Sequence, residues 1–258
     1  MSELTNRRPS GLNRQALRTW GMLGIVLGAA GSGILQNGIL NLGDTDAMGL
    51  LQAMEGSSTM MGFATLALVL QAICCCAAPI FAFLLTEGFS RTSSRKNYFL
   101  RVLGLALVSE LPYNLAVSGT WLASDGRNPV FALALALVML YFYCRYPGKR
   151  LGNVAIKTVV TVAAFAWAFM LRIDEGPSLV LLVAVLWLLR GKPTLRVLFG
   201  CVTAFACSLF SPFYLASPMA FLAIHFYNGE KGEGSPWVNY LSYPAILLIA
   251  GLLGTYFM

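Results

Sequence analysis

A carboxylate and an amide lie one helical turn apart inside a long apolar stretch, at Glu110 and Asn114. Ionisable groups at membrane depth cost about 2.5 to 3.5 kcal/mol each, which makes them functional candidates. We expect Pro112 to break the helix beside Glu110 and to free a backbone carbonyl. Such a site could bind a substrate, relay a proton or supply a general base. Alternatively, Glu110 pairs with a neighbouring polar group and fixes helix packing.

Charged residues end the preceding apolar stretch, where Glu87 is followed by Arg91 and, further on, by Arg101. Arginines near a helix start can bind the phosphates of a cofactor. An ordinary salt bridge between residues four apart explains the first two charges equally well. The sequence leaves both interpretations open.

The only histidine, His225, precedes a turn that contains Asn228, Gly229 and Lys231. It is a candidate general base, although a lone histidine in an apolar helix is more often a structural group. Glycine in the turn would let the backbone approach a ligand closely. No Ser-His-Asp set and no metal cluster can be recognised around this single histidine, so no metal is expected. The six cysteines are expected to pack as small apolar side chains.

These groups need helices in lipid to position them. Only 11% of the residues are charged and the mean hydropathy is +0.70, whereas soluble domains carry about a quarter charged residues. The sequence therefore predicts an all-α, polytopic transmembrane bundle with about nine spans of about 20 residues each. We place these spans at residues 20–41, 60–86, 98–118, 129–145, 152–171, 176–189, 195–211, 213–227 and 237–257. Pro79 is expected to kink the second span, and Gly24 and Gly28 are expected to allow close helix contact.

The basic residues predict which side each loop occupies. With a cytoplasmic N-terminus and alternating spans, 16 of the 18 basic residues fall on the inner side, leaving only Arg127 and Arg172 outside. This asymmetry follows the positive-inside rule and accounts for the net charge of +7 without nucleic acid. Residues 1–19 then form a basic cytoplasmic leader whose arginines act as a topology signal, and 20–258 form the membrane domain. The outer loops hold six acidic residues: Asp44, Asp46, Glu55, Asp125, Asp174 and Glu175.

Several motifs in this order resemble the TraX family. The most specific are the runs at residues 79–89 and 109–114. The basic segment at 90–101, Asn128 with Phe131, the run at 227–232 and Tyr243-Pro244 are also similar. Together the matches cover nearly the whole chain.

The resemblance implies a multi-pass protein of the bacterial inner membrane, in a family associated with N-terminal acetylation of conjugative pilin. It implies transfer of an acyl group from acetyl-CoA or another acyl-CoA to a protein or small-molecule acceptor. We expect Glu110 and His225 to be catalytic. The residues expected to bind substrate or donor are Glu87, Arg91, Arg101, Asn114, Asn128, Asn228 and Lys231.

The chain departs from the family pattern at polar positions. Family members usually carry Asp-His where this chain has Gly28 and Ala29, an arginine at Cys75, and a histidine near Ile246. Loss of a general base costs on the order of 10²–10⁴ in rate. Either Glu110 and His225 take over the chemistry, or the protein is a non-catalytic relative. Such a relative would transport a small solute or bind a membrane partner.

Overall fold

The structure, a computed structural model, describes residues 11–42, 47–53, 55, 57–123, 126–234 and 236–257. These residues form helices and two isolated β-bridges, and no strand runs through them. Five charged residues used in the loop argument lie outside the described residues: Arg7, Arg8, Asp44, Asp46 and Asp125.

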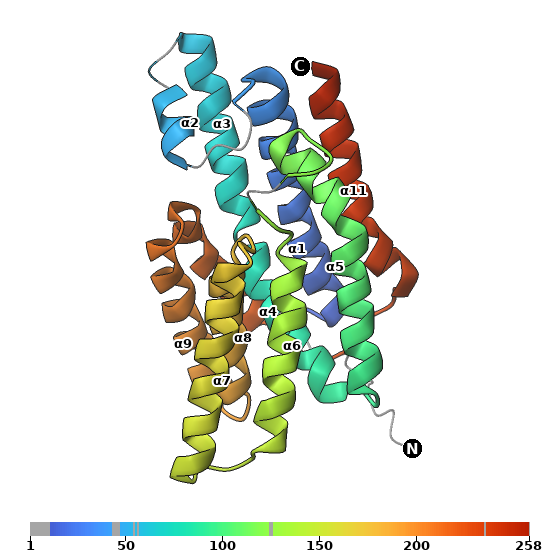
Figure 1. Cartoon of the computed structure of the whole chain (residues 1–258), viewed down its shortest axis with the longest axis vertical. Coiled ribbons are helices and arrows are strands. Elements are labelled where there is room, and N and C mark those ends of the chain that lie inside the picture. The colour runs from blue at the N-terminus through green and yellow to red at the C-terminus, as the bar shows by residue number, and fades with distance from the viewer. Residues whose placement is uncertain are drawn as a thin grey trace, which may run out of the picture.

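The helices form an elongated bundle with two groups that overlap at its middle (Figure 1). The first group comprises α1 (Arg14–Ala29), the π-helix η1 (Ala30–Ile39), α2 (Ala47–Ala53), α3 (Ser58–Cys74), α5 (Arg95–Ser118) and α11 (Pro236–Phe257). The second comprises α6 (Val130–Arg145), α7 (Leu151–Met170), α8 (Gly176–Leu188) and α9 (Pro193–Ala206). Helix α4 (Ala77–Arg91) packs against both α1 and α8 and so connects the two groups.

Within the part of the chain that the structure describes, five helical stretches are long and apolar enough to cross a membrane, which identifies a multi-pass membrane protein. They are Arg14–Ile39, Ser58–Arg91, Arg95–Ser118, Leu151–Met170 and Tyr240–Phe257. Three further apolar helices are shorter: Val130–Arg145, Gly176–Leu188 and Pro193–Leu209. The count of nine spans and the cytoplasmic N-terminus stay predictions.

The single span predicted at residues 213–227 is wrong. This segment forms a 3₁₀ helix, η3 (Pro212–Met219), followed by the short α10 (Ala220–His225). Pro212 and Pro218 provide the reason, because proline has no backbone N–H to donate to an α-helical hydrogen bond. The short 3₁₀ helix η2 (Cys207–Leu209) precedes this segment.

The two predicted proline effects have different outcomes. The kink in the second span is confirmed, because α3 ends and α4 begins around Cys75 and Cys76. Pro79 has no N–H for the carbonyl of Cys75, four residues earlier. The predicted break at Pro112 is wrong, because α5 runs unbroken through that residue. Packing against α11 on one side and α6 on another supports α5 there.

Glycines and amides hold the first group together. A Cβ atom on Gly33 of η1 would lie 2.9 Å from the carbonyl oxygen of Ala250 in α11, so these backbones pack closely. The Asn37 amide donates to the carbonyls of Ala116 and Val117 in α5, over 3.1 and 2.8 Å. Gly24, as predicted, lies against α3 at Ile73. These contacts fix the end of α1 beside the kink between α3 and α4.

The second group is organised around α8. Its side chains at Val180, Leu182 and Val183 are fully buried among α4, α6, α7 and α9. Because α8 has only 13 residues, the 171–175 loop before it begins near mid-height of the molecule (Figure 1). Glu175 therefore reaches the kink at Cys75, although the sequence counted it among outer-loop charges.

Candidate functional site

A basic cleft of about 270 Å³ lies between the start of α1, the end of α4 and the start of α5. We call this cleft the vestibule. Five basic side chains line it: Arg14, Arg18, Arg91, Arg101 and Lys231. No carboxylate is present among its described lining residues. Three of the predicted donor-binding residues, Arg91, Arg101 and Lys231, are thus brought together.

Two of the vestibule arginines have unused donors. The Nε and Nη2 atoms of Arg14 and the Nε atom of Arg18 are buried without a hydrogen-bond partner among the described residues. Buried polar atoms nearly always have a partner, so these donors suit an external anion. Both arginines were predicted to belong to the basic leader. Their spacing of four residues, which puts them on one helix face, was the missed signal.

Glu87 supports the vestibule from behind. Its carboxylate accepts from Arg91 over 3.1 Å and from Arg196 over 2.8 Å. Arg196 also donates to the Thr86 hydroxyl over 2.6 Å, and Arg91 donates to the carbonyl of Gly229 over 2.7 Å. The salt-bridge interpretation of Glu87 and Arg91 is confirmed. A direct role for Glu87 in donor binding stays a prediction.

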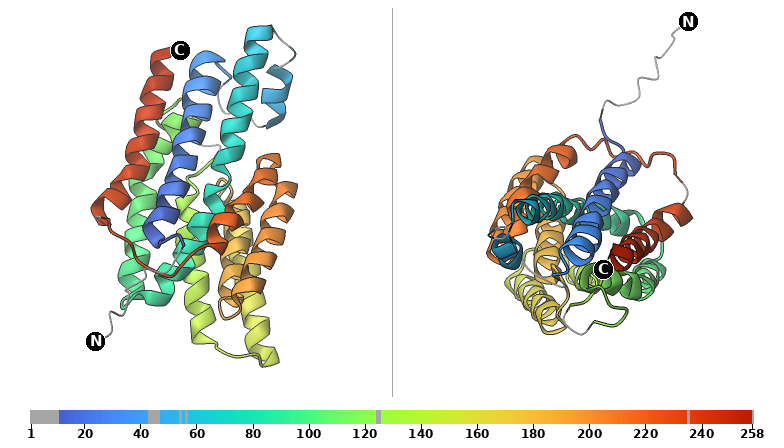
Figure 2. Two further views of the ribbon diagram at one scale, coloured as in Figure 1. Left: turned by 180° about the vertical axis from the view of Figure 1, so that it is seen from behind. Right: turned by 90° about the horizontal axis from the view of Figure 1, so that it is seen from above.

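The segment at residues 226–234 forms one wall of the vestibule and crosses the start of α1 (Figure 2). The amide of Leu12 donates to the carbonyl of Phe226, and the amide of Asn228 donates back to the carbonyl of Leu12. The amide of Arg14 donates to the carbonyl of Glu230 over 2.8 Å. These bonds place Lys231 in the vestibule and give Asn228 a structural role.

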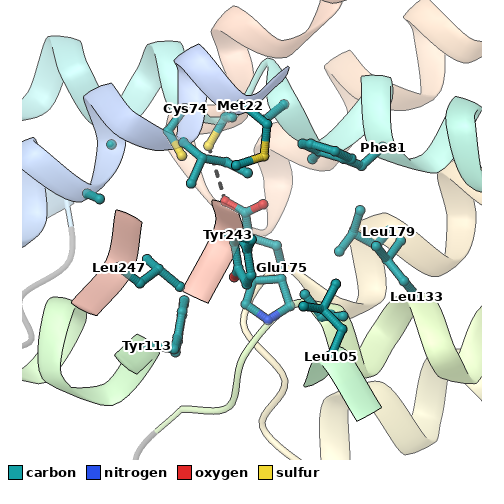
Figure 3. A pocket seen from close by; sticks show the side chains of 18 of the residues that line it. Met22, Cys74, Phe81, Leu105, Tyr113, Leu133, Glu175, Leu179, Tyr243 and Leu247 are labelled. Atoms are coloured by element: carbon teal, nitrogen blue, oxygen red, sulfur yellow. Dashed lines mark hydrogen bonds between the residues drawn. The ribbon is translucent and has the colours of Figure 1, made fainter. Parts of the chain in front are cut away.

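An apolar cavity of about 320 Å³, which we call the chamber, adjoins the vestibule. Arg18, Leu84, Tyr98 and Tyr240 line both spaces. Most other chamber residues are apolar, among them Met22, Ile25, Phe81, Leu85, Val102, Leu105, Leu133, Leu179, Phe213 and Leu247. Figure 3 shows Phe81, Leu105, Leu133 and Leu179 on one side of this space, with Tyr113 and Leu247 on the other.

Glu175 is the carboxylate that lines the chamber (Figure 3). The Cys75 thiol donates to its Oε1 over 3.3 Å and the Tyr214 hydroxyl donates to its Oε2 over 3.0 Å. Burial raises the pKa of the Glu175 carboxyl, and these two hydrogen bonds oppose the shift only in part. Neither Glu175 nor Cys75 was predicted as a site residue, because Glu175 was expected in an outer loop and Cys75 was expected to pack as a small apolar side chain.

Glu110 lies beside the chamber without lining it. Its carboxylate accepts from the backbone amide of Asn128 over 3.1 Å and lies 3.9 Å from Arg127. Asn128, which is fully buried, accepts from the hydroxyl of Tyr243 over 2.9 Å. Tyr243 does line the chamber, so Glu110 reaches it through two intermediate groups. Asn114 is buried on the same helix.

His225 lies apart from this network. Its side chain is exposed and packs edge-on against Phe226 with 5.3 Å between ring centres. It is absent from the described lining of either cavity. The preceding residue, Ile224, is buried and takes the inward position on α10. The structure therefore does not assemble the expected pair of Glu110 and His225.

The positions at which the resemblance implied polar side chains lie in or beside the chamber. Gly28, Ala29 and Cys75 all line it. Ile246 packs in the neighbouring apolar cluster with Ala29 and Leu247. The positions at which polar side chains were expected thus surround one space, and apolar or small side chains fill them.

The sequence comparisons agree with the motif assignment. The family model described as TraX protein matches residues 50–254, which include Glu110, Cys75, Glu175 and the vestibule residue Lys231. The match begins after Gly28 and Ala29. No curated protein and no solved structure shows a significant match. Because the family model covers most of the chain, the protein belongs to the TraX family.

Proposed function

We propose that this TraX-family protein is a membrane acyltransferase that takes its acyl group from an acyl-CoA donor. In this proposal the vestibule binds the phosphates of the donor, and the chamber receives its acyl chain. The observation that carries the proposal is that the vestibule and the chamber share part of their lining. A basic cleft, whose buried guanidinium donors have no partner among the described residues, adjoins an apolar cavity, and both share Arg18, Leu84, Tyr98 and Tyr240.

Phosphate recognition is supported by the kind of side chain in the vestibule. Arginine presents several donors in a planar fork and bonds phosphate oxygens in pairs. Arg91 is held in place by Glu87 and Gly229, so little side-chain freedom is lost when it binds. The buried donors of Arg14 and Arg18 gain partners on binding, which favours an anion over water.

The chamber supports a chain longer than acetyl. Its 320 Å³ equals the volume of about ten water molecules at about 30 Å³ each. An acetyl group would leave most of this apolar space unfilled, whereas each additional buried methylene contributes about 0.8 kcal/mol. Acetyl-CoA fits the proposal as the minimal donor, and a longer acyl-CoA fills the chamber better.

The acceptor would be a protein or small molecule, and the family association with pilin acetylation suggests a protein N-terminus at a bacterial inner membrane. Glu110 stays a candidate for the chemistry, acting through Asn128 and Tyr243. His225 would need another molecule or a rearrangement to meet the chamber, because its side chain is exposed.

The alternative function is a relative that binds the same kind of molecule without transferring its acyl group. One observation favours it: Gly28, Ala29 and Cys75 line the chamber where the family carries polar side chains. Such a protein would transport a small solute or bind a membrane partner. It would bind acyl-CoA, if at all, without releasing free CoA.

Purified full-length protein in detergent tests both functions. Binding is titrated with acetyl-CoA and octanoyl-CoA, and release of free CoA thiol is followed in parallel. We expect both donors to bind, octanoyl-CoA more tightly, and thiol to appear in proportion to enzyme. Absence of saturable donor binding would contradict the proposal. Binding without thiol release, with or without candidate amine acceptors, would favour the alternative.

A further inference from the structure

Cys75 and Glu175 form a thiol–carboxylate pair inside the chamber, with 3.3 Å between Sγ and Oε1. We propose that Cys75 is a nucleophile that carries the acyl group as a thioester, with Glu175 as its base. This inference rests on the proposed function and adds a covalent step to it. A nucleophile, a base within hydrogen-bond reach and a third group that orients the base are the parts that such a step needs.

Tyr214 is the orienting group. Its hydroxyl donates to Oε2 of Glu175 over 3.0 Å, which leaves Oε1 directed at the Cys75 thiol. Tyr214 is fully buried, so the hydrogen bond holds the carboxylate in one position. In Figure 3 the carboxylate of Glu175 points toward the side of the chamber formed by Cys74 and Met22.

Helix ends surround the pair, and they favour negative charge on Glu175 more than on Cys75. Cys75 directly precedes Cys76, the N-cap of α4, and Glu175 is the N-cap of α8. The N-terminus of a helix carries partial positive charge, so the start of α8 stabilises the Glu175 carboxylate. Cys75 precedes α4 but is also the C-cap of α3, so the opposite ends of two helix dipoles meet at its sulfur, and Glu175 is needed to accept the thiol proton. Ala77 and Ala78, in the first turn of α4, line the chamber, so this end of the helix adjoins the reacting groups.

The reaction consists of two balanced transfers. Sγ of Cys75 attacks the thioester carbonyl of the donor while Glu175 accepts the thiol proton, because an apolar chamber disfavours a free thiolate. The bond from the carbonyl carbon to the CoA sulfur breaks, and CoA leaves as a thiol with the proton from Glu175. An acceptor amine or hydroxyl then attacks the Cys75 thioester, gives its proton to Glu175, and Cys75 leaves and is reprotonated. No oxidant or reductant is needed.

The neighbouring cysteines provide matched controls. The Cys76 thiol donates to the carbonyl of Ala216 over 3.2 Å, and Cys76 is absent from the described chamber lining. Cys74 lines the chamber, packed against Gly28 of α1. Among the described cysteines, Cys75 is the one with a carboxylate partner.

The test uses full-length protein with octanoyl-CoA in the absence of acceptor, followed by acid quench and intact mass measurement. We expect an adduct of one octanoyl group that neutral hydroxylamine removes. Cys75→Ala should abolish the adduct, and Cys76→Ala should leave it unchanged. Glu175→Gln should slow its formation by about 10²–10⁴. Octanoyl-CoA binding, measured on each variant, shows whether the chamber is intact.

A hydroxylamine-labile adduct that maps to Cys75 and requires Glu175 would establish the inference. Cys75→Ser serves as a second variant if Cys75→Ala loses donor binding, because its oxyester would resist neutral hydroxylamine. An adduct that persists unchanged in both Cys75 variants would overturn the inference. Wild-type protein that binds octanoyl-CoA without forming an adduct would overturn it too and leave the proposed function standing. Absence of donor binding would overturn both.

Discussion

The vestibule and the chamber differ in how their charged groups are paired. In the vestibule, buried donors of Arg14 and Arg18 have no partner among the described residues. In and around the chamber, each carboxylate accepts a hydrogen bond: Glu175 from Cys75 and Tyr214, Glu110 from the amide of Asn128, and Asp174 from the Tyr113 hydroxyl. The vestibule is therefore prepared for a charged ligand from outside, and the chamber for an uncharged one.

The two spaces also differ in how they meet the expectations drawn from the family resemblance. The vestibule is lined by five basic side chains, whereas Gly28, Ala29 and Cys75 line the chamber at positions where the resemblance implied polar groups. A protein with an intact anion site and an altered reaction space should still bind its donor. If it still transfers an acyl group, the reaction must use other groups in the chamber, and Glu175 is a carboxylate that lines it.

The largest effect is expected in the vestibule. Replacing Arg14 and Arg18 together by glutamine should weaken octanoyl-CoA binding by about two orders of magnitude or more, because hydrogen bonds to charged groups contribute about 1.5–3 kcal/mol each. Equilibrium binding to the purified protein measures this. Lys149→Ala, which removes an exposed basic residue between α6 and α7, is the matched control. Equal losses in both would mean that the arginines act only through net charge.

A smaller effect is expected in the chamber. Leu105→Trp places a larger side chain in the lining of the chamber. It should remove most of the preference for octanoyl-CoA over acetyl-CoA, because each methylene that can no longer enter the chamber loses about 0.8 kcal/mol of binding free energy. Binding of CoA without an acyl group should stay unchanged. Comparing the three dissociation constants checks both statements. A preference that survives the substitution would place the acyl chain elsewhere.

A still smaller effect is expected at Glu110, which lies beside the chamber. Glu110→Ala leaves the buried amide of Asn128 without its acceptor, which costs about 1–3 kcal/mol. We expect a lower midpoint of thermal unfolding in detergent, with donor affinity little changed because Glu110 is absent from the described chamber lining. Loss of donor binding with an unchanged unfolding midpoint would show that Glu110 contacts the donor directly.

The smallest effect concerns pH. Burial raises the pKa of Glu175, so this group stabilises the fold most below its unfolded pKa, and that contribution is lost as pH rises through the folded pKa. Glu175→Gln has no such titration. The difference in unfolding midpoint should therefore shift in favour of Glu175→Gln as pH increases above the ordinary glutamate range. A difference that stays constant with pH would show that Glu175 ionises as freely in the fold as in the unfolded chain.

Most of the fold could be predicted from the sequence, because a membrane requires long apolar helices and backbone groups satisfied within each helix. The segment with Pro212 and Pro218 was mistaken for a span because hydropathy does not register a missing N–H. The break predicted at Pro112 was wrong because packing against other helices, which the sequence does not reveal, supports α5 through this residue.

The vestibule was partly predictable and the chamber was not. Arg91 and Lys231 follow predicted spans and Arg101 lies near the start of one, and the positive-inside rule assigns all three to the same side, so charge alone groups them. Glu175 was missed because alternation of sides assigns its loop to the exterior. The signal against that assignment is length, since a helix of 13 residues is too short to carry its ends to both faces of a bilayer at 1.5 Å per residue.

The central claim is that one acyl-CoA molecule occupies both spaces. A photoreactive acyl-CoA with a diazirine at the end of its chain, crosslinked to the purified protein and mapped by mass spectrometry, tests it most directly. We predict labels on the chamber side chains of α4, α5 and α6, such as Phe81, Leu105 and Leu133, that excess octanoyl-CoA prevents. Labels confined to the outer face of α7, where Phe169 and Val159 are exposed, and unaffected by competitor would contradict it.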